Sequence, residues 1–91
     1  MQERTLKILN EEGMHARPAG VLAKLASGFS STVEIVANGK TVNAKSIMSV
    51  MALGLTRDTE LLVRANGADE TEAITKIELK ILIVYINLAI E

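Results

Sequence analysis

Residues 32–42 read TVEIVANGKTV, and this stretch decides how the fold is built. Apolar and polar side chains alternate through Ile35, as they do in a strand with one buried face. Asn38-Gly39 follows, the dipeptide that best suits a two-residue hairpin turn because both residues accept a positive φ. The chain continues with Lys40-Thr41-Val42. The sequence therefore predicts two antiparallel strands joined by a tight turn.

Other elements are predicted on both sides of this hairpin. Residues 5–8 and 60–65 alternate in the same way and predict two further strands. Residues 16–29 carry apolar side chains at spacings of three and four, which indicates an amphipathic helix. Gly28 is placed to end that helix. A strand and a helix are thus expected before the hairpin, and another strand after it.

Two more helices are predicted from their starting residues. Ser46 precedes an apolar-rich run over residues 47–53, and serine is a favoured N-cap. Gly54 lies just beyond the end of this short helix. Asp69 is followed three residues later by Glu72, which predicts a capping-box start for a final helix. Both helices follow a predicted strand.

The predicted element order is β-α-β-β-α-β-α, which is the split βαβ pattern with one helix added. It indicates an α+β fold: a two-layer, open-faced β-sandwich in which a four-stranded antiparallel sheet is covered on one face by three helices. A chain of 91 residues is long enough for one modest core. Residues 1–91 are therefore expected to form a single domain.

The final helix has more apolar residues than one sheet face can cover. The segment 81–86 is also uncharged and prone to form strands. This excess favours packing against a partner, including self-association through the C-terminal helix, or aggregation. The regular stripe is Ile74, Ile77, Ile81, Val84 and Leu88, and the residues off it are Leu79, Leu82, Ile83, Ile86 and Ile90.

The composition argues against several classes of function. The chain has no cysteine and one histidine, so neither a metal site nor a cofactor is expected. Phe29 and Tyr85 are the only aromatic residues and the net charge is -1, which makes nucleic acid a poor partner. No secretory signal is visible, and no apolar run approaches the roughly 20 residues of a spanning helix. We expect a cytoplasmic protein without membrane insertion.

The single histidine, His15, comes just before the first predicted helix. The first turn of a helix combines amides that lack intrahelical acceptors with the positive end of the helix dipole, and it binds phosphate. Pro18 fits such a turn, and Arg17 adds a fork of charged donors. Both the helix end and Arg17 disfavour the imidazolium, so His15 is expected to be a neutral nucleophile near pH 7. The residues alone leave open that His15 is an ordinary surface residue or cap.

The run GMHARPA over residues 13–19, with KSIM at 45–48 and LGL at 53–55, resembles HPr. HPr is the histidine phosphocarrier family of the bacterial sugar phosphotransferase system. The resemblance covers about residues 4–75 and includes the element order. The sequence KSIM is more similar to the HPr of low-GC Gram-positive bacteria than to the enterobacterial form.

This resemblance implies a carrier with a phosphohistidine intermediate rather than a stand-alone enzyme. His15 would accept phosphate from phospho-enzyme I and donate it to the IIA domains of sugar permeases. Arg17 would steady the phosphate together with the backbone amides of Ala16 and Arg17. Ser46 would match the regulatory serine that HPr kinase/phosphorylase modifies. The docking surface for enzyme I, IIA domains and the catabolite control repressor would contain Met14, Ile47, Met48 and Met51.

Plainer explanations compete with these roles. Ser46 is explained by capping alone, and methionines are common core fillers. A purely regulatory HPr-like protein, acting through phospho-Ser46 with a catabolite control repressor, is one alternative, although such relatives lack the active histidine. A structural or interaction module with an incidental histidine is another. Gly20 departs from the family pattern. It lies inside the first predicted helix, where glycine lowers helix stability by about 1 kcal/mol relative to alanine.

Overall fold

The computed structural model describes residues 1–8 and 16–90, with side chains described as far as Ile81. Within these residues, four strands and three helices follow in the order β1-α1-β2-β3-α2-β4-α3. This order confirms the prediction. The strands are β1 (Gln2–Lys7), β2 (Thr32–Ala37), β3 (Lys40–Asn43) and β4 (Glu60–Asn66), and the helices are α1 (Ala16–Ser27), α2 (Ile47–Ala52) and α3 (Glu70–Ile90).

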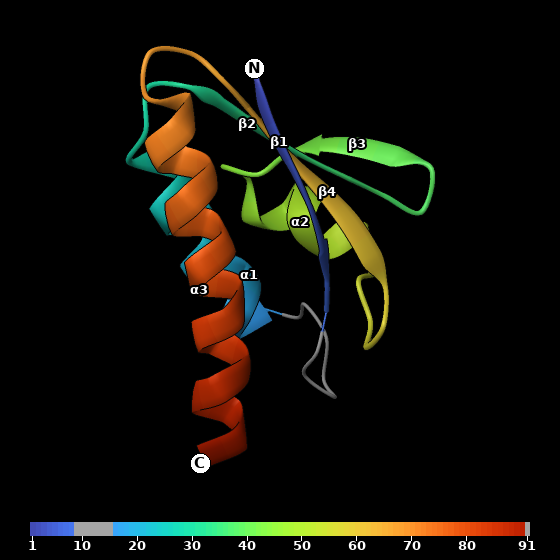
Figure 1. Cartoon of the computed structure of the whole chain (residues 1–91). Coiled ribbons are helices and arrows are strands. Elements are labelled where there is room, and N and C mark those ends of the chain that lie inside the picture. Colours follow the sequence, from blue (N-terminus) through green and yellow to red (C-terminus); the bar gives the residue numbers. More distant parts are fainter. Residues whose placement is uncertain (9–15, 91) are drawn as a thin grey trace.

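The four strands form one antiparallel sheet in the order β1-β4-β2-β3. Strand β4 lies between β1 and β2, so that Val63 is paired with Arg4 on one side and with Ile35 on the other. The long helices α1 and α3 lie side by side in the layer next to the sheet (Figure 1). The predicted open-faced α+β sandwich is confirmed.

The hairpin between β2 and β3 has the predicted turn. Asn38 and Gly39 have φ values of 51° and 76°, the left-handed pair that a type I′ turn requires. The Asn38 side chain also donates a hydrogen bond of 2.9 Å from Nδ2 to the carbonyl oxygen of Leu53, at the end of α2. The turn residue therefore sets the hairpin and connects it to the second helix.

Helix α1 lies against the sheet through small and medium side chains. Ala19, Leu22, Ala23 and Ala26 are all buried, which confirms the amphipathic pattern. The helix ends at Ser27, but Gly28 does not adopt the left-handed conformation of a glycine cap. Its N–H instead donates to the carbonyl oxygen of Leu25 at 3.1 Å in a tight final turn.

Helix α3 contributes the predicted stripe to the core. Ile74, Ile77 and Ile81 are buried, whereas Leu79, off the stripe, is 52% exposed. The 21 residues of α3 span about 31 Å, and a seven-residue strand spans about 23 Å. The C-terminal end of α3 accordingly extends past the sheet (Figure 1). The remaining predicted stripe residues, Val84 and Leu88, have side chains outside the described part of the structure.

The junction before α3 differs from the predicted capping box. The Asp69 carboxylate accepts hydrogen bonds of 2.9 Å from the backbone N–H groups of Ser30 and Ser31, and another from the Ser31 hydroxyl. These donors lie in the connection between α1 and β2, not in α3. Glu72 pairs instead with Lys76 at 2.8 Å along the helix. The helix begins where predicted, but its cap side chain joins two distant segments.

Close approach at this junction also requires a glycine. Gly67 has a φ of 153°, and a Cβ atom placed on it would lie 2.7 Å from the Cα atom of Ser31. No real Cβ makes so short a contact, so any side chain would push the two connections apart. Ser31 itself is 1% exposed, and its hydroxyl is satisfied by Asp69. The two connections can approach each other closely because Gly67 has no side chain.

Strand β1 starts earlier than the predicted residues 5–8. Its first half pairs with β4, and Glu3 forms an ion pair with Arg64 at 2.8 Å. Arg64 also approaches Glu34 on the next strand at 3.7 Å. These charged side chains lie on the face of the sheet opposite the core. Alternating apolar residues therefore do not predict this part of the strand. Cross-strand pairing extends the strand where the sequence pattern alone does not.

We expect Asp69→Asn to lower the melting temperature at pH 7. The hydrogen bonds from Ser31 and Ser30 lower the pKa of Asp69 from 3.8 to about 2. A carboxyl whose pKa is depressed by folding stabilises the protein above its unfolded pKa, and this stabilisation is lost as the pH falls through its folded pKa. The native and variant melting temperatures should therefore converge between about pH 4 and pH 2. Thermal unfolding followed by circular dichroism at several pH values measures this.

Glu72→Gln is the matched control, because Glu72 pairs only with the exposed Lys76 within the helix among the contacts described. This variant should melt close to the native protein at pH 7. A difference between native and Asp69→Asn that stays constant from pH 7 to pH 2 would contradict the proposed role of the ionised carboxylate.

Candidate functional site

The predicted phosphoryl site is described in part. His15 and Met14 lie outside the described residues. Helix α1 begins at Ala16, the residue that follows His15 in the chain. The described part of the site is therefore the first turn of α1, which was predicted to hold the anion-binding groups.

The first turn of α1 has an electropositive character. It contains no acidic residue, and both Ala16 and Arg17 are exposed. The positive end of the helix dipole and the Arg17 guanidinium thus act on the same region. Pro18 is buried and has no N–H to lose in a first helical turn, so it connects the turn to the core without weakening the helix. This arrangement can stabilise an added negative charge.

Ser46 is the N-cap of α2, as predicted. Its backbone is extended, with φ -106° and ψ 114°, and its Oγ accepts a hydrogen bond of 3.3 Å from the N–H of Ser49. The Ser46 carbonyl oxygen accepts the N–H of Val50 at 3.1 Å. The side chain is half-buried. Its oxygen therefore lies at the positive end of a short helix.

The residues before Ser46 are held by tertiary contacts. Lys45 Nζ donates a hydrogen bond of 2.9 Å to the carbonyl oxygen of Phe29, in the connection that follows α1. The Ala44 N–H donates to Val33 on β2 at 2.8 Å. The position of Ser46 relative to α1 thus depends on these two contacts. No local sequence pattern predicts the Lys45 contact, because its partner lies 16 residues away in the chain.

The predicted docking residues of α2 lie on the surface. Met48 is 78% exposed, Ile47 45% and Met51 39%. These side chains are not core filler in the described structure. Val21, on α1, is also 39% exposed and was missed by the sequence analysis. Val21 falls outside the buried stripe of α1. Its exposure could have been predicted from this position on the helix.

We give the name α1/α2 surface to six exposed residues of helices α1 and α2, because these two helices pack against each other. Over residues 16–27 and 47–52, neither helix contains an acidic residue. An apolar centre with a positive rim is complementary to a partner whose surface is apolar and acidic. The α1/α2 surface consists of Arg17, Val21 and Lys24 from α1 and Ile47, Met48 and Met51 from α2.

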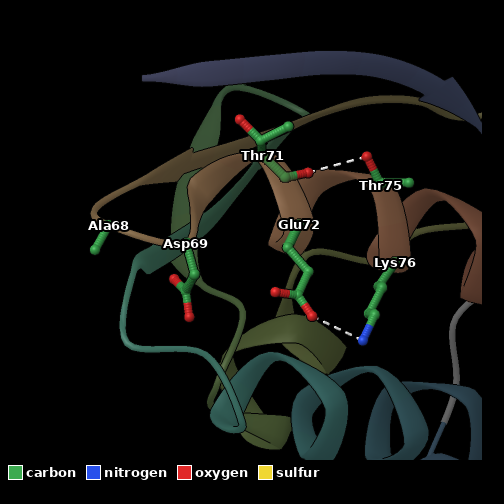
Figure 2. Close-up of a pocket in the computed structure, with 6 residues that line it drawn as sticks. All are labelled: Ala68, Asp69, Thr71, Glu72, Thr75 and Lys76. Carbon is green, nitrogen blue, oxygen red and sulfur yellow. Dashed lines mark hydrogen bonds and ion pairs between the residues drawn. The ribbon is translucent and has the colours of Figure 1, made fainter.

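A hollow along the start of α3 is a weaker candidate (Figure 2). All of its charged side chains are already paired, Glu72 with Lys76 and Asp69 with the serines described above, and the Thr75 hydroxyl donates to the Thr71 carbonyl oxygen. In the described part of the chain, no three His, Cys, Asp or Glu residues gather into a metal-binding cluster. Across the same residues, no helix combines the length and apolar character needed to cross a membrane.

Comparison with known proteins agrees with this geometry. The family model for the phosphorylation site of the HPr component of the phosphotransferase system matches residues 2–81. The chain therefore belongs to the HPr family of phosphocarriers of the phosphotransferase system. The matched residues include both helices of the α1/α2 surface and the segment that contains His15.

Solved structures of this family superpose closely. The histidine-containing phosphocarrier protein of Mycoplasma is 43% identical, with a TM-score of 0.90 over 92% of this chain and 96% of that one. An HPr from Thermoanaerobacter tengcongensis is 44% identical, with a TM-score of 0.81 over 89% and 96%. Crh, a catabolite-repression protein of Bacillus subtilis solved as a domain-swapped dimer, is 36% identical, with a TM-score of 0.72 over 90% and 94%.

Ser46→Ala should destabilise the protein by about 0.5–1 kcal/mol, because it removes the acceptor for the Ser49 N–H. The 3.3 Å distance places the effect at the lower end of the range for N-caps. Ser46→Asn retains a capping oxygen and should stay close to the native stability. Urea unfolding measures both variants, and equal midpoints for Ser46→Ala and the native protein would contradict the capping role.

Proposed function

We propose that the protein carries a phosphoryl group on His15, accepting it from phospho-enzyme I and donating it to the IIA domains of sugar permeases. The observation that supports this most directly is the start of α1 at Ala16, one residue after the histidine. The residue that would gain the phosphate's charge is therefore followed directly in the chain by the positive end of a helix and by Arg17.

The chemistry requires a neutral imidazole nitrogen as nucleophile. A bond forms between this nitrogen and phosphorus while the bond from phosphorus to the donor breaks, and the reverse exchange takes place on an acceptor. Little covalent work is left to the carrier, so alignment and charge stabilisation decide the rate. Arg17 and the backbone amides of Ala16 and Arg17 supply that stabilisation in this proposal. The exposure of the first turn suits a group that two partners must reach.

The α1/α2 surface would receive both partners in turn. Its apolar side chains, including Met48 and Ile47, would supply buried contact area, and thioethers adapt to more than one partner. Arg17 and Lys24 would attract acidic groups and align the approach. Met14, from its place in the sequence, is proposed as a further contact. A carrier gains from one shared surface, because donor and acceptor need the same phosphohistidine.

Ser46 is proposed as the regulatory site, modified by HPr kinase/phosphorylase. A phosphate there would bring a charge of about -1.5 to -2 to the start of α2, where the helix end stabilises it. The same charge would adjoin a surface that has no acidic residue on either helix. It would repel an acidic phosphoryl donor and favour a different partner, the catabolite control repressor.

A purely regulatory function through phospho-Ser46 is the second candidate. The similarity to Crh, and the position of Ser46 at a helix start, are the observations that favour it. The two functions differ in one requirement, because the regulator needs no phosphate on His15. The presence of His15 in the sequence favours the carrier.

We expect incubation with phosphoenolpyruvate and enzyme I to add one phosphate that is labile in acid and stable in base. Phosphorus NMR identifies it as phosphohistidine. His15→Ala should abolish the signal, since the chain contains no other histidine. Arg17→Ala should slow phosphorylation by roughly tenfold or more, through loss of charge stabilisation.

Circular dichroism must show that the His15→Ala variant remains folded. Phosphorylation that persists in this folded variant would overturn the carrier proposal. A native protein that takes no phosphate from enzyme I, but binds the repressor once Ser46 is phosphorylated, would establish the regulatory alternative.

Ser46→Asp should reduce the kcat/KM of phosphorylation by enzyme I by roughly tenfold, because it puts a negative charge beside the α1/α2 surface. Ser46→Asn is the matched control, with the same shape and no charge. The difference between the two should shrink as salt is raised, since exposed charges are screened. Equal rates for the aspartate and asparagine variants at low salt would contradict an electrostatic mechanism.

A further inference from the structure

Helix α3 has an apolar row on the face that points away from the core. Leu79 is 52% exposed, although it lies in the interior of this 21-residue helix. Three isoleucines, Ile83, Ile86 and Ile90, follow it at spacings of four, three and four residues. These spacings place all of them on the same face of the helix as Leu79. We call these four residues the outer row of α3.

The outer row lies opposite the buried stripe of the same helix. Ile77 and Ile81 are buried in the core, and each is two positions from Leu79, which is about 200° around the helix axis. The packing that explains the buried stripe therefore does not explain the outer row. The C-terminal end of α3 also extends past the sheet (Figure 1), and the family match stops at residue 81. Most of the outer row thus belongs to a part of the helix that the shared fold does not account for.

The spacing of the outer row indicates which partner fits it. Apolar residues at spacings of four, three and four form the heptad pattern through which two helices pack against each other. This spacing is also the same when it is read backwards. An antiparallel copy of α3 therefore matches Leu79 with the partner subunit's Ile90, and Ile83 with the partner subunit's Ile86. The two-fold axis repeats both matches, so every residue of the row has an apolar counterpart.

The charges beside the outer row agree with a second copy and not with a lipid surface. Lys80 is the only charged residue from Leu79 to Ile90. In the antiparallel register it lies near the level of the partner subunit's Asn87, so no like charges meet. Helices that lie on membranes combine an apolar face with a cluster of basic residues, which one lysine does not provide. The ten uncharged residues 81–90 also fall far short of a membrane span.

We propose that α3 is a dimerisation helix, and that two copies of this chain pair in antiparallel orientation through the outer row. The same four residues are contributed by both copies, so the contact closes at two chains and does not continue into a fibre. The α1/α2 surface belongs to other helices, and each copy keeps its own. This dimer is independent of the proposed phosphoryl transfer.

Sedimentation velocity of the full chain tests the inference. The native protein should change from monomer to dimer as its concentration is raised through the micromolar range. Leu79→Lys should raise the dissociation constant of the dimer by roughly tenfold or more, because it puts a charge into an apolar layer. Leu79 is exposed in the single chain and lysine favours helices, so this variant should stay folded by circular dichroism. Ile83→Lys should weaken the dimer at a central layer.

Thr71→Lys is the matched control, because it adds the same charge at an exposed position of α3 that lies eight residues before Leu79. This variant should dimerise like the native protein. A native chain that stays monomeric would overturn the inference, and so would a monomer that binds vesicles of phosphatidylglycerol instead. A dimer that neither Leu79→Lys nor Ile83→Lys weakens would overturn it as well.

Crosslinking tests the orientation of the pair. The chain contains no cysteine, so an introduced cysteine can form a disulfide only with another introduced one. An equal mixture of the Leu79→Cys and Ile90→Cys proteins should give crosslinks between unlike chains after mild oxidation. Efficient crosslinking of the Leu79→Cys protein with itself would indicate a parallel pair and would overturn the antiparallel register.

Discussion

The burial of one stripe of α1 in the core decides which side of this helix faces outward. Ala19, Leu22, Ala23 and Ala26 are buried, and three of them are short enough for α1 to pack closely against α2 and α3. With that stripe buried, the opposite side of α1 must face outward. The same constraint directs the N-terminal turn and its positive dipole end to the surface. The same packing contact therefore exposes both the first turn of α1 and the residues of the α1/α2 surface.

The connection after α1 also fixes the start of α2, where Ser46 is the N-cap. Asp69 accepts hydrogen bonds from Ser30 and Ser31, and Lys45 donates one to Phe29, all within the connection from α1 to β2. The start of α3 and the approach to Ser46 are therefore attached to the same short segment. Charged groups make these links, and charge-assisted hydrogen bonds are stronger than neutral ones. Ser46 is in this way placed relative to α1 by contacts outside its own helix.

Membership of the HPr family implies interaction with proteins of the phosphotransferase system. The exposed methionines of α2 adapt their shape, and the absence of acids on α1 and α2 over the described helices keeps the surface positive.

Local patterns in the sequence determined the hairpin at Asn38-Gly39, the buried stripe of α1 and the cap at Ser46, because each depends on residues a few positions apart. Tertiary structure alone decided where the Asp69 carboxylate binds and which exposed residues join Val21 on one surface. The capping box predicted from Asp69 and Glu72 was wrong because donors 38 and 39 residues away compete for the same carboxylate. Spacing along the chain carries no information about such donors, since only folding brings them into contact.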